Sequence, residues 1–92
     1  MERILVADDE QKIRKLVGDF LKKSGYDVIE AEDGDEAFRL FQMNKNDISL
    51  IILDIMMPGL NGWEVCRRVR ESSNVPVILL SARSEEFDML TG

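Results

Sequence analysis

Histidine is absent from the 92-residue sequence, and cysteine occurs only once, as Cys66. The chain alone therefore cannot supply a Ser-His-Asp triad, a Cys-His pair, an HExxH zinc site, a His-ligated haem or an internal disulfide. Any chemistry must depend on carboxylates and hydroxyls. No apolar run approaches the ~20 residues that span a bilayer, and the amino terminus has no secretory apolar segment. We therefore expect a soluble, cytoplasmic protein without a membrane partner.

Basic side chains are also few, because 12 Lys and Arg stand against 18 Asp and Glu, for a net charge of -6. This balance argues against direct binding of nucleic acid by this domain and is compatible with a cation site. The chain is 45% apolar and 33% charged, as in globular proteins. Its length predicts one small domain.

Strand and helix patterns alternate along the chain. Short apolar runs typical of buried strands occupy residues 3–8, 26–30, 48–53 and 76–80. Helical patterns begin at residue 10, at the acidic segment 33–36 and at the Asn61–Glu64 capping box. The first helix carries an apolar stripe of Ile13, Leu16, Val17, Phe20 and Leu21. This alternation predicts an α/β fold, a doubly wound parallel sheet with right-handed crossovers.

Three acids follow strands that should be neighbours in such a sheet. Asp8 and Asp9 end the first strand, and Asp54 ends the third. Ligands of open α/β sheets bind where the strand order reverses, at the carboxyl ends of the strands. Clustered carboxylates either take up protons or bind a cation, and oxygen ligands without histidine or thiolate favour Mg²⁺.

An aspartate beside Mg²⁺ can attack phosphorus, so Asp54 is the candidate nucleophile. Ser81 ends the fourth strand and could donate a hydrogen bond to a phosphoryl oxygen. A simpler interpretation of Asp8 and Asp9 is that they cap the first helix near its positive end. The residues Met56, Met57 and Trp63 are more typical of packing than of a ligand site.

Three segments then carry a family resemblance: Val6–Glu10 (VADDE), Leu53–Gly62 (LDIMMPGLNG) and Pro76–Ala82 (PVILLSA). In order and spacing they resemble the receiver domain of bacterial two-component response regulators. The resemblance implies a flavodoxin-like sheet of order 2-1-3-4-5. Residues 1–92 would then be the N-terminal portion of such a domain, with strand order 2-1-3-4 and the fifth strand and helix absent.

The resemblance also implies roles for the candidate residues. Asp54 would accept a phosphoryl group from a sensor histidine kinase, so the phosphohistidine would lie on the donor. Mg²⁺ would be held by Asp9, Asp54 and the backbone carbonyl of Met56, and by Asp8 through water. Ser81 would be the switch hydroxyl. Such a domain is not an enzyme in the usual sense, since it at most catalyses its own phosphorylation and dephosphorylation.

Two other functions stay open. One is a catalytically inert interaction or dimerisation module of the same fold, because the family's fifth strand begins with a lysine that pairs with the phosphoryl group, and this sequence ends at Gly92 without it. The other, less favoured, is a Mg²⁺-dependent phosphatase with an aspartyl intermediate, although Met56 stands where a DxD motif would need its second acid. The uncovered fourth strand further predicts a homodimer through its edge.

Overall fold

The computed structural model describes residues 2–80, in which strands and helices alternate as the sequence predicts. The elements are β1 (Arg3–Ala7), α1 (Gln11–Lys23), β2 (Asp27–Ala31), α2 (Gly34–Met43), β3 (Ile48–Asp54), α3 (Gly62–Arg70) and β4 (Val77–Leu80). The strand bounds and the helix starts agree with the expected ones to within one or two residues. The switch hydroxyl expected at Ser81 lies outside the described residues.

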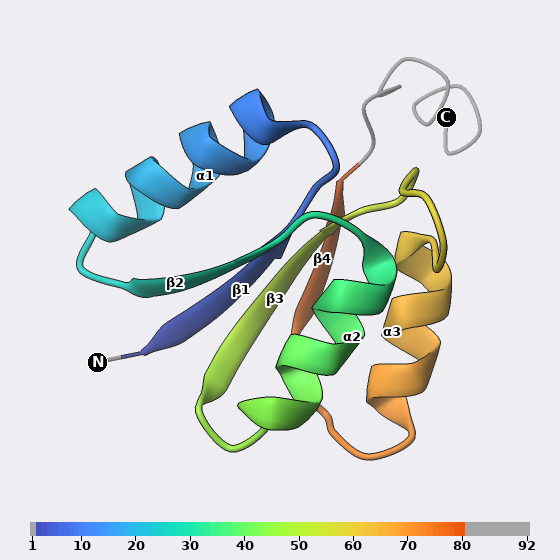
Figure 1. Ribbon diagram of the computed structural model, residues 1–92. Coiled ribbons are helices and arrows are strands. Elements are labelled where there is room, and N and C mark those ends of the chain that lie inside the picture. Colours follow the sequence, from blue (N-terminus) through green and yellow to red (C-terminus); the bar gives the residue numbers. More distant parts are fainter. Residues whose placement is uncertain (1, 81–92) are drawn as a thin grey trace, which may run out of the picture.

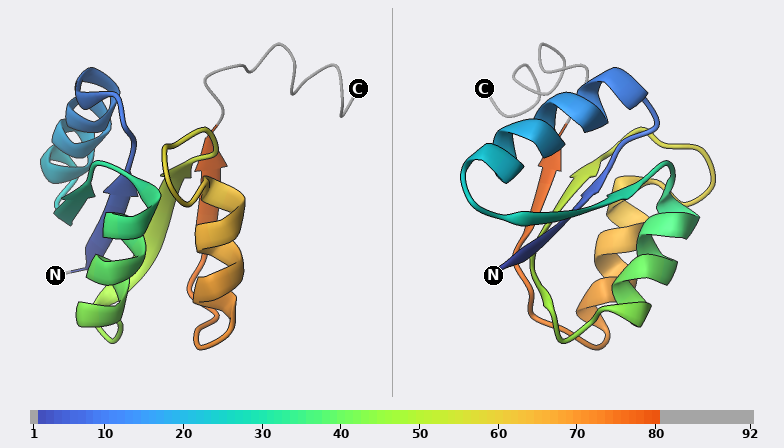
Figure 2. Two further views of the ribbon diagram at one scale, coloured as in Figure 1. Left: turned by 45° about the vertical axis from the view of Figure 1, so that its right-hand side comes forward. Right: turned by 60° about the vertical axis from the view of Figure 1, so that its left-hand side comes forward.

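The four strands form one parallel sheet of order β2-β1-β3-β4, which confirms the predicted order. Helix α1 covers one face of this sheet, and α2 and α3 lie side by side on the other (Figures 1 and 2). The chain winds outward from β1 to β2 and then crosses to β3 on the opposite side of β1. The strand order therefore reverses between β1 and β3, where their carboxyl ends lie together.

Two apolar layers hold the sheet between its helices. Alternate residues of β1 serve the two layers, because Leu5 and Ala7 face α2 and α3 whereas Ile4 and Val6 face α1. The larger layer includes the fully buried Phe41 of α2 and Val65 and Val69 of α3. Both faces of β1 and β3 are thus largely covered, which fixes the ends of these strands in position.

The buried face of α1 differs from the predicted one. Leu16 and Phe20 are 71% and 69% exposed, and of the predicted stripe only Leu21 is buried. The helix instead places Arg14 and Gly18 against the sheet. Gly18 lies close to β2, where a Cβ would make ordinary van der Waals contact with Glu30 and Val28. The apolar pattern thus identified the helix and part of its buried face, since Val17 packs against the core beside the buried Leu21, whereas Leu16 and Phe20 lie outside it.

Strand β4 forms one edge of the sheet within residues 2–80, and its Ile78 and Leu80 are 46% and 37% exposed. This agrees with the expected uncovered edge, whereas the homodimer expected from it stays a prediction. Across the same residues, no helix combines the length and apolar character needed to cross a membrane.

Candidate functional site

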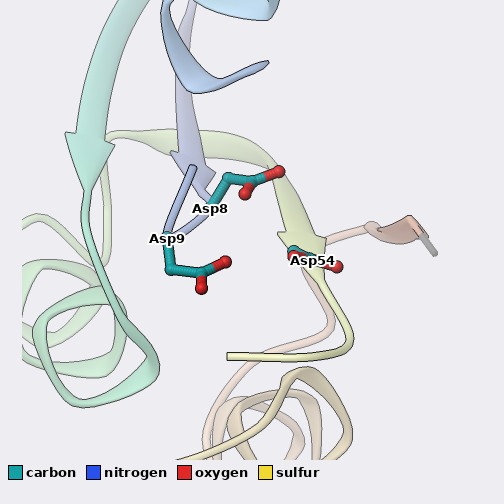
Figure 3. Close-up of side chains that lie close together, drawn as sticks. All are labelled: Asp8, Asp9 and Asp54. Atoms are coloured by element: carbon teal, nitrogen blue, oxygen red, sulfur yellow. The ribbon is translucent and has the colours of Figure 1, made fainter. Parts of the chain in front are cut away.

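The three predicted acids come together at the carboxyl end of the sheet. Ala7 pairs with Leu53 in the register of β1 and β3, so that Asp8 and Asp54 follow at the same level. A carboxylate oxygen from each of Asp8, Asp9 and Asp54 lies within 4.8 Å of the others (Figure 3). Asp8 and Asp54 are 5% and 4% exposed, whereas Asp9 is open to solvent. Two buried acids and one exposed acid therefore face one small space.

Each buried acid is oriented by the backbone that follows it. The Asp8 carboxylate accepts a hydrogen bond from the Glu10 N–H at 2.9 Å, and the Asp54 carboxylate accepts one from the Met56 N–H at 3.3 Å. Both are Asx turns, in which an aspartate side chain bonds the backbone two residues later. These turns hold the two carboxylates in place as the chain leaves its strands.

Burial is the main cause that raises the pKa of Asp8 above its ordinary value, and the negative charge of Asp9 adds to it. The Glu10 N–H and the positive charge of Arg14 act in the opposite direction. The pKa of Asp54 is likewise raised, first by burial and then by the charge on Asp8, while the Met56 N–H opposes the shift. The negative charge of Asp8 thus makes the ionisation of Asp54 more costly, as the charge of Asp9 does for Asp8.

The loop from β3 to α3 folds back over the end of β3. Gly59 has φ +72°, which favours glycine, and the Gly62 N–H donates to the Ile55 carbonyl at 2.9 Å. Asn61 and Glu64 form the predicted capping box, with the Asn61 side chain accepting from the Glu64 N–H at 2.9 Å. Helix α3 therefore begins directly beside Asp54.

The side chains around this loop partly contradict the packing prediction. Met57 is buried in the larger core, as expected, but Met56 and Trp63 are 57% and 55% exposed. Met56 contacts the site through its backbone N–H, which bonds the Asp54 carboxylate, while its side chain projects into solvent. Cys66 is partly buried on α3 and is a free thiol within the described residues.

One residue near the site was missed in the sequence. Arg14 of α1 is only 8% exposed, and its Nη1 donates to the backbone carbonyl of Asp8 at 2.8 Å. Its Nε donates to Glu30 of β2 at 3.1 Å. The sequence offered one signal, a basic residue that follows the apolar Ile13 in the first turn of the predicted helix. It does not show whether such a side chain points toward the sheet or toward solvent.

The site fits a hard divalent cation. The ligand atoms that the side chains of the cluster offer are all carboxylate oxygens, which Mg²⁺ prefers. Backbone N–H groups already orient the carboxylates of the two buried acids, Asp8 and Asp54. Asp9 is exposed, so the space stays open to water and to phosphate oxygens, which complete most Mg²⁺ sites.

Comparisons with known proteins agree with this geometry. The profile of the response regulator receiver domain matches residues 4–92. The probable transcriptional regulator ycf27 of Porphyridium aerugineum is 46% identical over 91 residues, which are 99% of this chain and 37% of the relative. The chain thus spans little more than a third of the curated relatives it matches.

Solved structures of a Thermotoga maritima response regulator are also similar. TrrA in complex with Mg²⁺-BeF matches 99% of this chain and 78% of its own, with a TM-score of 0.80 and 41% identity. TrrA bound to the histidine kinase ThkA matches 89% of this chain and 70% of the other, with a TM-score of 0.77 and 43% identity. Fold, acidic cluster and sequence agree, and this chain belongs to the family of response regulator receiver domains.

Proposed function

We propose that the chain accepts a phosphoryl group on Asp54 from a histidine kinase, in a reaction that depends on Mg²⁺. The observation that carries this proposal is the buried Asp54 carboxylate, whose oxygen lies within 4.8 Å of carboxylate oxygens of Asp8 and Asp9 at the strand-order reversal. The similarity to TrrA, solved with Mg²⁺-BeF and with a histidine kinase, supports both the ion and the partner.

In this mechanism an Asp54 carboxylate oxygen attacks the phosphorus of the donor's phosphohistidine. The new P–O bond forms as the P–N bond breaks, and the electron pair of that bond stays on the imidazole nitrogen, which then takes up a proton. Bound Mg²⁺ would supply positive charge that offsets the charge on the phosphoryl oxygens. The Met56 N–H keeps one Asp54 oxygen oriented, so the other oxygen is available for the attack.

The proposed ligands of the ion are Asp9, Asp54 and the backbone carbonyl of Met56, with Asp8 acting through water. Ser81 keeps its proposed role as the hydroxyl that bonds the phosphoryl group. In this role the domain acts on itself only, through its own phosphorylation and dephosphorylation. We place this reaction in the cytoplasm, the location that the sequence predicts for the chain.

The test is incubation of the 92-residue chain with acetyl phosphate and Mg²⁺, followed by intact-mass measurement. We expect the wild type to gain one phosphoryl group, Asp54→Asn to gain none, and the exposed-surface control Asp19→Asn to behave as the wild type. Addition of EDTA should abolish the gain. A phosphoryl group on Asp54→Asn would place the acceptor elsewhere and refute the proposal.

Two outcomes favour the alternative functions. A wild type that binds Mg²⁺ but gains no phosphoryl group would support an inert interaction or dimerisation module, for which the exposed edge of β4 offers a surface. Continuous hydrolysis of a generic phosphate ester, lost in Asp54→Asn, would support a phosphatase.

A further inference from the structure

A buried arginine links the acidic site to the two strands on its α1 side. The Arg14 side chain is 9% exposed, and its guanidinium donates to the Asp8 carbonyl at 2.8 Å and to Glu30 at 3.1 Å. Its Nη2 lies 4.0 Å from a carboxylate oxygen of Glu32. One side chain of α1 thus contacts the end of β1, a residue of β2 and the segment after β2.

The contact with Asp8 fixes more than one residue. The Asp8 carbonyl belongs to the planar peptide unit that joins Asp8 to Asp9, so a hydrogen bond to this oxygen restricts the rotation of the whole unit. The Asp8 N–H donates to the Ala31 carbonyl at 3.2 Å, and the Asp8 carboxylate accepts from the Glu10 N–H. The backbone carbonyl is the third polar group of Asp8, and Arg14 bonds it. Through the peptide plane, this bond also restricts the backbone position of Asp9.

Position and charge predict opposite effects of Arg14 on a cation. A positive charge beside a cation site repels the ion, so charge alone would make Mg²⁺ bind more tightly once the guanidinium is removed. Position predicts the reverse, because an unrestrained Asp8–Asp9 peptide would no longer present the exposed Asp9 carboxylate toward Asp54. Glu30 lies within hydrogen-bonding distance of the guanidinium and offsets much of its charge. The positional effect should therefore dominate.

We propose that Arg14 is a positioning residue of the metal site, which orients the Asp8–Asp9 peptide for Mg²⁺ binding. This inference rests on the proposed function, since it concerns the same ion. Arg14 bonds the backbone carbonyl of Asp8 and not a carboxylate of the cluster, so its effect on a bound ion would pass through Asp8 and Asp9.

The experiment measures the Mg²⁺ dissociation constant of the chain by isothermal titration calorimetry, without a phosphoryl donor. In Arg14→Met, which keeps an apolar stem of similar length, we expect the constant to rise about 10-fold or more, as for other residues that orient metal ligands. Arg14→Lys keeps the charge but loses the planar fork of donors, so it should show a smaller rise. Thermal unfolding of each variant is measured first, and the titrations are carried out at a temperature at which all variants are folded.

Arg70 supplies the matched control. It is exposed near the carboxyl end of α3, and its Nη1 donates to the Val75 carbonyl at 2.6 Å. Arg70→Met thus removes the same charge and a similar bond to a backbone carbonyl, outside the acidic cluster, and its constant should stay within about 2-fold of wild type.

Three results would overturn the inference. Tighter binding in Arg14→Met would show that charge dominates. Unchanged binding in Arg14→Met with a lowered unfolding temperature would show that Arg14 serves stability only, and the proposed function would stand. If the wild type itself bound no Mg²⁺, the proposed function would fail together with the inference.

Discussion

Replacing Asp54 with asparagine should stabilise the metal-free protein. The buried Asp54 carboxylate lies within 4.8 Å of two other carboxylates, and asparagine has the same shape without the charge. Asparagine Oδ1 can still accept the Met56 N–H, so the Asx turn is kept. The substitution therefore removes the cost of burying a charge together with the repulsion from the neighbouring carboxylates.

The magnitude follows from the distances. Two unit charges about 5 Å apart repel by about 1 kcal/mol at an effective dielectric constant of about 80 and by about 3 kcal/mol at about 20. Burial and the neighbouring charges both raise the pKa values of Asp8 and Asp54, so the ionised forms of these carboxylates cost free energy in the folded state. We expect the free energy of unfolding at neutral pH in EDTA to rise by about 1–3 kcal/mol, and Tm to rise by at least about 4 °C for a domain of this size.

The assay is thermal unfolding followed by circular dichroism, with and without Mg²⁺. In EDTA, Asp54→Asn should unfold at a higher temperature than the wild type, whereas Asp19→Asn, which removes an equal charge from the exposed side of α1, should not. Mg²⁺ at about 100 times its dissociation constant should stabilise the wild type by about 2.7 kcal/mol and Asp54→Asn by much less. Asp54→Asn unfolding at or below the wild-type temperature in EDTA would refute the argument that burial and the neighbouring charges make ionised Asp54 destabilising.

The pH dependence has the same origin. Because burial raises the folded-state pKa of Asp54, its protonated form stabilises the fold, and this contribution is lost as pH rises through the raised pKa. The stability advantage of Asp54→Asn over wild type in EDTA should therefore shrink toward pH 4, and an advantage independent of pH would contradict this. Gly34→Ala should destabilise the chain by about 1–3 kcal/mol in urea unfolding, since a Cβ there would overlap the Leu60 carbonyl. The control Gly18→Ala has only ordinary contacts at its Cβ and should be neutral or stabilising by up to about 1 kcal/mol. Asn61→Ala should cost about 1 kcal/mol in the same assay by removing the α3 cap, and no loss would show that solvent replaces the cap.

Most of the fold was predictable because local signals and long-range packing agree in this chain. The strand Ile48–Asp54 is apolar at nearly every position, as a strand covered on both faces must be, and it is the third strand of the observed sheet. The Asn61–Glu64 pair predicted a capping box, and Asn61 is indeed the N-cap residue of α3. The convergence of Asp8 and Asp54 followed from topology, since parallel neighbours end at the same edge of a sheet.

The orientation of α1 was not predictable for a physical reason. Of its apolar residues, Leu21 is buried whereas Leu16 and Phe20 are exposed, so the apolar pattern alone does not fix which side of the helix faces the sheet. The buried side also carries Arg14, which adds polar contacts to that side. A buried guanidinium must be paired to offset the cost of its burial, and its partners are the Asp8 carbonyl and Glu30. Both lie at the carboxyl end of the sheet. The rotation of α1 and the orientation of the Asp8–Asp9 peptide therefore depend on the same hydrogen bonds of Arg14. The side of α1 that the hydrophobic pattern did not fully identify is thus the side that contacts the acidic site.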